Sequence, residues 1–174
     1  AQPRSIIADG AKTKGYDPAL AEQLFDLMTK FAEYGFNKSH TAAYAVVSYQ
    51  TAWLKAHHTA AFMAATMSSE LDNTDQLRVF FDDCVETNHL RFLPTAINQS
   101  HYRFVPTDRK HIRYALGAIK GTGEAAVEHL VAERAAQGPF TGLLDFCHRT
   151  DKRTVNRRTI EALIRAGAFD SLDP

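Results

Sequence analysis

The chain has 174 residues, of which 45% are hydrophobic, and its formal net charge at pH 7 is zero. This length and hydrophobic content allow one large or two small domains with a buried core. A neutral chain gives no overall argument for a nucleic-acid partner. However, residues 1–100 carry 8 Lys/Arg against 11 Asp/Glu and residues 101–174 carry 12 against 9, so their net charges are −3 and +3. This asymmetry is weak evidence for a polyanionic partner of the C-terminal half.

Cellular location is constrained mainly by what the sequence lacks. No apolar run approaches the length of a membrane span, and the N-terminus has no charged-then-apolar signal pattern. Cys84 and Cys147 lie far apart and follow no metal or redox spacing, which is typical of reduced thiols. We therefore expect a cytoplasmic protein with no membrane partner. The abrupt beginning and end of the sequence suggest a piece of a longer chain.

The first predicted helix follows a polar, glycine-bearing stretch at residues 1–15. Asp17 is a good N-cap and Pro18 fits a first helical turn. An apolar stripe then recurs at helical spacing, at Leu20, Leu24, Leu27 and Phe31. Residues 23–25, Gln-Leu-Phe, allow a sliding-clamp peptide as an alternative, but the stripe already explains them as core.

Residues 31–54 contain a turn followed by a long amphipathic helix. Gly35 and Asn37 are helix breakers, and Asn37 or Ser39 can cap the helix that follows. Lys38 and His40 stand at the helix entrance, where the macrodipole opposes a cation and favours an anion. A bound phosphate would account for them, while ordinary surface polarity is the alternative. The predicted buried face of this helix comprises Tyr44, Val46, Val47, Thr51, Trp53 and Leu54.

Two sets of residues allow a metal-site interpretation in the next two predicted helices, at residues 60–71 and 74–85. His57 and His58 are adjacent and point to different sides of a helix, with no further ligand at a suitable spacing. The second set is Asp82, Asp83 and Glu86. Paired carboxylates of this kind hold Mg²⁺ in polymerases, but adjacent acids on a helix more commonly form a solvated face. We therefore expect neither a metal site nor a catalytic residue in this chain.

A β-hairpin and then a helix–hairpin–helix pattern follow. Residues 102–105 and 112–115 alternate apolar and polar side chains around a polar turn. Residues 116–119 predict a short helix, residues 120–123 a tight turn, and residues 124–134 a second helix. The turn reads Lys120-Gly121-Thr122-Gly123, and its glycines allow unusual φ values and a close approach of backbone N–H groups to a phosphate oxygen. A purely structural turn is the alternative.

The closing segment is basic. Arg157 and Arg158 lead a predicted helix that ends near residue 165, and they either contact DNA or form a solvated face. Residues 167–170 resemble a second hairpin, but the helix that would complete it is missing from the chain.

Parts of the sequence resemble a known family. The segments Tyr34-Gly-Phe-Asn-Lys-Ser-His40, Ala42-Ala-Tyr-Ala45, Val47-Ser-Tyr-Gln-Thr51 and Trp53-Leu-Lys-Ala-His57 resemble the fingers of the α subunit of bacterial DNA polymerase III, the C-family replicative polymerase. The resemblance continues at lower density through residues 117–124, 156–158 and 166–170.

The resemblance implies a function for each candidate residue. Asn37, Lys38, Ser39 and His40 would bind the triphosphate of an incoming deoxynucleotide. Tyr44 would lie against the nascent base pair or sugar, unless it is a core aromatic. The DNA-binding set would be Lys120, Gly121, Thr122, Gly123, Arg157 and Arg158. The metal-binding aspartates of the family precede this segment, so Mg²⁺ is expected for the whole enzyme and no cofactor for this chain.

Together these patterns predict a mainly α fold in two parts, with a small β-hairpin between them. Residues 1–98 would be the C-terminal part of the fingers, and residues 99–174 the hairpin with a truncated tandem helix–hairpin–helix module. The expected partners are primer–template DNA, a deoxynucleoside triphosphate and the remaining polymerase domains, with the sliding clamp and other holoenzyme subunits contacting other regions. The alternative is a stand-alone, sequence-independent DNA-binding module. This chain alone is expected not to polymerise DNA.

Overall fold

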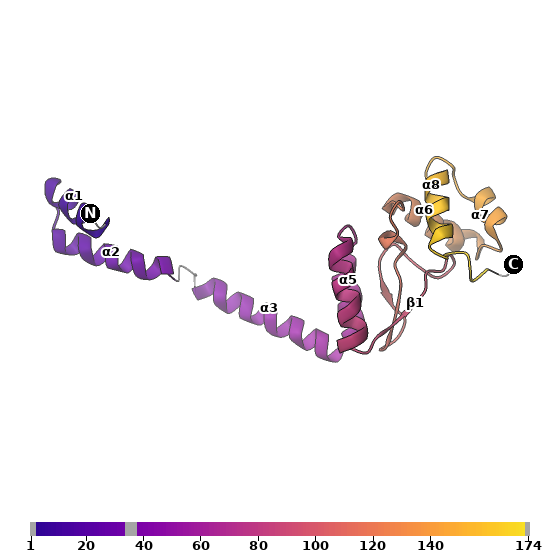
Figure 1. The fold of residues 1–174 in the computed structure, drawn as a ribbon, viewed down its shortest axis with the longest axis horizontal. Coiled ribbons are helices and arrows are strands. Elements are labelled where there is room, and N and C mark those ends of the chain that lie inside the picture. Colours follow the sequence, from indigo (N-terminus) through magenta and orange to yellow (C-terminus); the bar gives the residue numbers. More distant parts are fainter. Residues whose placement is uncertain (1–2, 34–37, 173–174) are drawn as a thin grey trace. The chain divides into compact units, whose positions relative to one another are not determined.

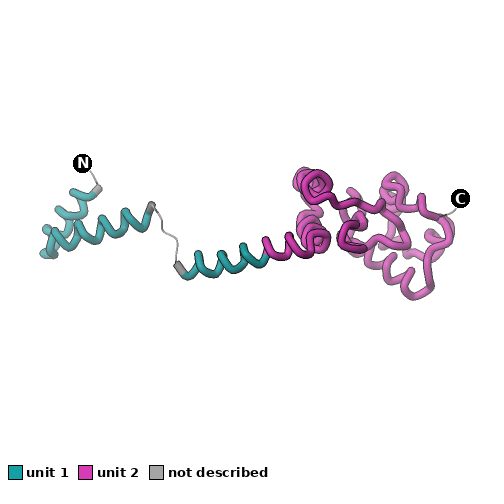
Figure 2. Tube along the Cα trace, turned by 90° about the horizontal axis from the view of Figure 1, so that it is seen from below, with its two compact units in different colours: residues 1–50 teal, residues 51–174 magenta. Residues whose placement is uncertain are grey.

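The computed structural model describes residues 3–33 and 38–172. The chain divides into two compact units, residues 1–50 and residues 51–174 (Figures 1 and 2). Helices predominate in both units, and one three-stranded sheet lies within the second. The predicted fold class, mainly α with a small β-hairpin, is confirmed.

The first unit contains two helices that pack against each other, α1 (Pro3–Thr13) and α2 (Pro18–Glu33). The carboxylate of Asp17 accepts a hydrogen bond from the backbone N–H of Ala19 at 2.9 Å, so this residue caps α2 as predicted. Arg4 joins the helices through Glu22 and Asp26, at 3.4 and 2.8 Å. No helix was predicted within the polar, glycine-bearing stretch at residues 1–15, but residues 3–13 are helical.

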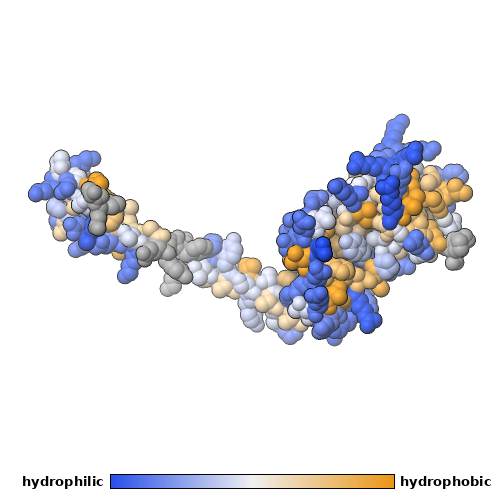
Figure 3. Space-filling view, in the orientation of Figure 1, coloured by the Kyte–Doolittle hydropathy of each residue, from blue (hydrophilic) through white to orange (hydrophobic). Residues whose placement is uncertain are grey.

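The apolar stripe of α2 and the apolar face of α3 (Lys38–His57) are exposed in this chain. Both were expected to be buried, and the helices themselves form as predicted. Periodicity identifies which face of a helix is apolar but not which element covers that face. Figure 3 shows apolar side chains on the surface of both units. The exposed fractions lie between 42% and 64% for Leu20, Leu24, Leu27, Met28, Phe31, Tyr44, Val46, Val47, Trp53 and Leu54.

The first core of residues 51–174 lies among α4 (Thr59–Ser69), α5 (Thr74–Asp82) and the sheet. Met63 and Met67 of α4 are fully buried in it. Asn73 caps α5 by accepting a hydrogen bond from Gln76 N–H at 3.2 Å. Cys84 is also buried, and desolvation raises the pKa of its thiol to about 11, which keeps the thiol protonated and unreactive.

The sheet has the strand order β1-β3-β2. β2 (Val105–Pro106) pairs antiparallel with β3 (His111–Arg113), which confirms the predicted hairpin in shortened form. β1 (Arg91–Leu93) pairs in parallel with β3 in the register Phe92–Ile112 and was not predicted. Three residues next to a proline give too little alternation to indicate a strand.

The second core joins η2 (Leu116–Ala118), α6 (Glu124–Gln137), α7 (Leu143–Arg149) and α8 (Arg157–Arg165). Phe146 lies at its centre, with edge-to-face contacts to Phe140 and Phe169. The guanidinium of Arg149 ties α7 to the end of α6, and it lies 4.4 Å from the ring centroid of Phe140. Its hydrogen-bond acceptors are the carboxylates of Glu133 and Asp145 and the carbonyl oxygens of Glu133, Gly138 and Pro139.

The compact units meet after Gln50, whereas the sequence analysis placed a domain boundary between residues 98 and 99. That boundary falls between β1 and β2, which share β3, so the sheet connects its two sides. As a limit between polymerase domains it stays a prediction. None of the described helices is long and apolar enough to cross a membrane.

The end of α3 is linked to a π-helical turn that continues α5. This turn, η1 (Asp83–Thr87), carries Asp83, whose Oδ2 lies 3.1 Å from Nζ of Lys55. The hydrogen bond from Lys55 is the largest of the effects that lower the pKa of Asp83 from its usual 3.8. A carboxyl group with a lowered folded-state pKa stabilises the fold above its unfolded pKa, and this stabilisation is lost as the pH falls through the folded value.

We therefore predict that the Asp83→Asn variant is less stable than the wild type at pH 7 and that the difference shrinks as the pH falls below 3.8. The measurement is urea unfolding at several pH values, followed by the fluorescence of Trp53, the only tryptophan in the chain. Acidification affects the other carboxylates equally in both proteins, so the difference isolates Asp83. A difference that stayed constant from pH 7 to pH 3 would contradict the prediction.

Candidate nucleic-acid interface

The turn at residues 119–123 has a fixed backbone. Gly121 has a φ of +104°, which only glycine adopts without strain. Thr122 is buried, and its hydroxyl lies between the carbonyl oxygens of Leu116 and Ile119, at 2.5 and 2.7 Å. Its backbone N–H donates to the Ile119 carbonyl at 3.1 Å. Thr122 was predicted as a DNA contact, but its side chain points into the fold and holds the turn.

The start of α6 is open to a ligand. Gly123 is the N-cap and has no side chain to cap the first turn. A Cβ placed on Gly123 would meet no atom within 4 Å, so the space beside this residue is free. The N–H groups of a first helical turn attract anions, and in α6 that of Ala126 already donates to the carbonyl oxygen of Gly123 at 3.1 Å, which leaves those of Glu124 and Ala125 for a ligand. Glu124 also lies in this turn and adds a negative charge that a phosphate must tolerate.

Helix α8 packs against this turn and brings a basic residue to it. The hydroxyl of Thr159 donates to the carbonyl oxygen of Gly121 at 3.3 Å. A Cβ placed on Gly121 would lie 3.9 Å from Nε of Arg158 and 3.7 Å from Cβ of Ala162. Arg158 is exposed, as is Lys120. The structure thus unites two predicted DNA-binding segments that are separated by more than thirty residues.

Arg157 differs from its neighbour. Its side chain is 93% exposed and pairs with Glu161 one turn further along α8, at 2.8 Å. The hydrogen bond from Arg157 lowers the pKa of Glu161, so this carboxylate stays charged at neutral pH. Such exposed pairs are worth little and exchange readily for a stronger anion. The sequence predicted the same contact for both arginines and did not distinguish them.

The sequence analysis missed two residues that shape this interface. Asn156 caps α8 by accepting a hydrogen bond from Thr159 N–H at 3.1 Å, and Thr159 then reaches Gly121. The cap was detectable, since Asn directly before a helix is a standard N-cap. The contact between Thr159 and Gly121 was not detectable, because it depends on how α8 packs.

The second predicted hairpin, after α8, is a helix end of the Schellman type. Gly167 has a φ of +72°, and the N–H groups of Gly167 and Ala168 donate to the carbonyl oxygens of Ile164 and Leu163, both at 3.0 Å. The carbonyl oxygen of Ala168 in turn accepts from Ile97 N–H at 2.7 Å. This turn is therefore anchored to the segment before the hairpin, and a DNA contact there stays a prediction.

The predicted nucleotide-binding residues lie at the start of α3. Asn37 lies outside the described residues, as does the side chain of Lys38, although Lys38 begins the helix. Ser39, His40 and Tyr44 are exposed, and the rings of His40 and Tyr44 stack at 4.2 Å. Tyr44 is 60% exposed, so it is not a core aromatic of this chain. Its role toward a nucleotide stays a prediction.

The described residues contain no group of three or more His, Cys, Asp or Glu side chains that could hold a metal ion. Asp83, one of the candidate acids, pairs with Lys55. His57 and His58 both lie against the ring of Trp53, with centroid distances of 4.6 and 5.6 Å.

Comparison with known proteins relates both parts of the chain to one family. A family model described as a helix-hairpin-helix motif matches residues 89–174. The DNA polymerase III subunit alpha of Neisseria meningitidis serogroup B is 64% identical over 98% of the chain. That of Xylella fastidiosa is 54% identical over 99% of the chain, and that of Escherichia coli is 49% identical over 100% of the chain. The chain spans only 14–15% of the length of these relatives. It therefore belongs to the family of DNA polymerase III alpha subunits, as one segment of such a subunit.

Proposed function

We propose that the chain is the segment of a DNA-directed DNA polymerase that holds duplex DNA by its backbone and faces the incoming nucleotide. The observation that carries the proposal is the turn at residues 119–123, which offers the uncapped start of α6 between Lys120 and Arg158. Backbone N–H groups and cations bind phosphate oxygens, which are the same in every sequence. A polymerase that moves along its template needs a contact of this kind.

The nucleotide contact is the second part of the proposal. Lys38 and His40 would face the triphosphate, Asn37 and Ser39 would shape the helix entrance, and Tyr44 would lie against the new base pair. Phosphoryl transfer needs metal ions held by carboxylates as well as positive groups on the phosphates. In this proposal Mg²⁺ would be held by carboxylates in other parts of the polymerase. This chain by itself would then not extend a primer.

The remaining polymerase domains are the proposed partners of the exposed apolar faces of α2 and α3. The sliding clamp and other subunits would contact regions outside this chain, and the site of action would be the cytoplasm. The alternative is a stand-alone DNA-binding module. It explains less of the sequence, because the similarity to the relatives extends over nearly the whole chain and not only over residues 89–174.

A glycine substitution at the start of α6 tests the duplex contact. Gly123→Val places a side chain in free space at the point where a phosphate would approach, so we expect duplex affinity to fall by about tenfold or more. Gly142→Val is the matched control, since Gly142 is also an N-cap glycine with free space around it, at the start of α7. The measurement is fluorescence anisotropy with labelled duplex DNA across a salt series.

Equal affinities of the two valine variants for duplex DNA would sink the proposed contact at this turn. Both substitutions carry a similar cost at a helix N-cap, so circular dichroism should show the same fold in each. Gly121 is a poor choice for this test, because its φ of +104° makes any larger residue strained.

Thr122→Val tests whether the fixed backbone matters for binding. The change keeps the shape but removes the hydroxyl between two carbonyl oxygens, each of which retains one backbone partner. We expect a loss of about 1 kcal/mol in unfolding free energy, together with weaker duplex binding. Thr122→Ser should restore both properties. Binding that stayed unchanged while stability fell would show that the turn need not be rigid.

Lys38→Ala in the complete polymerase tests the nucleotide contact. Removing a positive charge from the triphosphate should lower kcat/KM for the deoxynucleotide about tenfold or more and leave the Kd for primer–template unchanged. Lys30→Ala, in the last turn of α2, is the matched removal of one lysine. Steady-state kinetics that are identical in the two variants would refute a role of Lys38 toward the nucleotide.

A further inference from the structure

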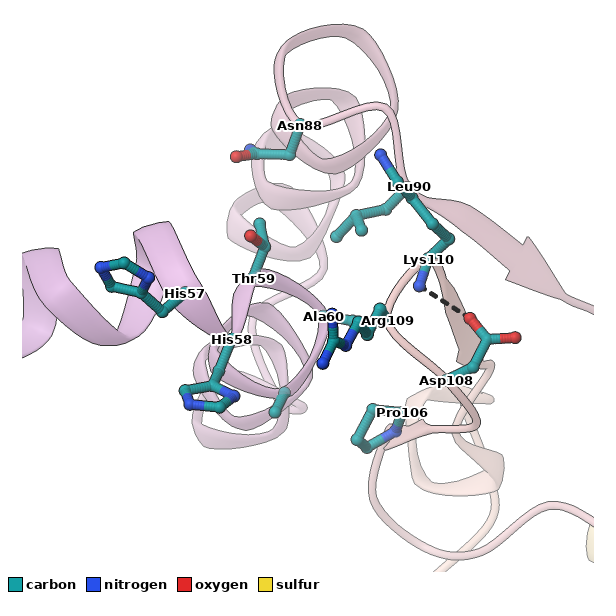
Figure 4. Close-up of a pocket in the computed structure, with 11 residues that line it drawn as sticks. His57, His58, Thr59, Ala60, Asn88, Leu90, Pro106, Asp108, Arg109 and Lys110 are labelled. Carbon is teal, nitrogen blue, oxygen red and sulfur yellow. Dashed lines mark hydrogen bonds between the residues drawn. The ribbon is translucent and has the colours of Figure 1, made fainter.

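A second basic site lies next to residues 108–110, which precede β3, whereas the turn at residues 119–123 follows β3 in the chain. It is a cavity of about 460 Å³, here called the α4 pocket (Figure 4). Pro106 of β2 and residues 108–110 of the turn before β3 form one wall, while the residues before and at the start of α4 form the other. The residues that matter for its chemistry are His57, His58, Thr59, Asn88, Arg109 and Lys110.

The two cations of the turn before β3 are available to a ligand. Neither Arg109 nor Lys110 forms an ion pair with any acidic side chain in the described part of the chain. Asp108 also lines the pocket, but its carboxylate accepts hydrogen bonds from the backbone N–H groups of Lys110 and His111, and it pairs with the His111 ring at 2.8 Å. The acid in the pocket is thus already engaged by other donors; its charge still counts, so Arg109, Lys110 and Asp108 together leave a net charge of +1.

The opposite wall provides further donors and aromatic rings. His58 precedes α4 as its N-cap and makes no side-chain capping bond, and the first-turn residues Thr59 and Ala60 line the pocket. Trp53 is 44% exposed and lies against both His57 and His58. Proteins that bind single-stranded nucleic acids combine aromatic side chains with a basic groove, because an unpaired base can stack on the ring while its phosphate contacts the cations. A partly exposed indole beside a basic cavity offers the same combination.

We propose that the α4 pocket binds a phosphate of single-stranded nucleic acid, with a neighbouring base against Trp53. A paired base keeps its faces stacked in the duplex and cannot reach the ring, so the site favours the unpaired strand over the duplex. Arg109 and Lys110 hold the phosphate. The inference extends the proposed DNA-binding function, but it rests on residues that take no part in the duplex contact.

Removal of the two cations tests the proposal. The double variant Arg109→Ala/Lys110→Ala is titrated with a labelled oligothymidylate across a salt series, beside the wild-type chain. We expect affinity for the oligomer to fall about tenfold and the slope of log K against log salt to decrease by about 0.7 for each phosphate that is no longer neutralised. Quenching of Trp53 by the oligomer, visible because the chain has one tryptophan, should disappear, while duplex binding stays unchanged.

Matched controls separate this site from general electrostatics. Lys12→Ala/Lys14→Ala removes the same charge from exposed residues elsewhere and should leave oligothymidylate binding intact. Equal decreases in affinity for both double variants, or no decrease for Arg109→Ala/Lys110→Ala, would overturn the proposal. Inorganic pyrophosphate is the third probe. If it binds the pocket in an Arg109- and Lys110-dependent manner and the oligomer does not, the ligand is a small phosphate compound and the assignment to a strand is wrong.

Because Gly123→Val should weaken only the duplex contact, it also distinguishes the two sites. Unchanged oligothymidylate affinity in that variant, together with weakened duplex binding, supports both assignments. Absence of oligothymidylate binding in Gly123→Val, with retention in Arg109→Ala/Lys110→Ala, would place the single strand at the turn and overturn the α4 pocket.

Discussion

The hydroxyl of Thr122, held between the carbonyl oxygens of Leu116 and Ile119, fixes the one backbone conformation on which the candidate interface depends. A helix N-terminus attracts a phosphate only if the chain before it turns away and leaves the first N–H groups accessible. Gly121 makes that turn possible through its positive φ, and Gly123 leaves the space beside the helix free. The buried hydroxyl makes the turn stable. The sequence places the two glycines and the threonine that make this turn within residues 120–123.

Packing of α8 then converts a local turn into a charged site. Thr159 donates to Gly121, and this contact sets Arg158 beside the turn, while Arg157 points to solvent and pairs with Glu161. Adjacent residues on a helix face about 100° apart, so only one of two neighbouring arginines can address a given phosphate. The spacing in the sequence does not reveal which one does so, because that depends on the packing of α8 against a turn almost forty residues earlier.

The sequence predicted features whose cause is local and failed where the cause lies elsewhere in the chain. The cap at Asp17, the hairpin before residue 116 and the glycine turn follow from the residues that form them. β1 was missed because a parallel partner twenty residues away creates it. The apolar faces of α2 and α3 were predicted as core and are exposed. An amphipathic pattern specifies that a face needs a partner, and the partner can belong to another part of a larger protein.

The sheet gives the two proposed nucleic-acid contacts a defined relation. β3 is the central strand, and both its neighbours hold it in register, so residues at its two ends cannot shift independently. Arg109 and Lys110 directly precede β3, and the turn that holds Gly121 follows it. One end of this strand thus leads through η2 to the proposed site for phosphates of the duplex, and the other end follows the basic pocket beside an aromatic ring. A protein that must keep paired and unpaired segments of a strand apart gains from placing their contacts on one rigid element, because the strand then sets the distance between them.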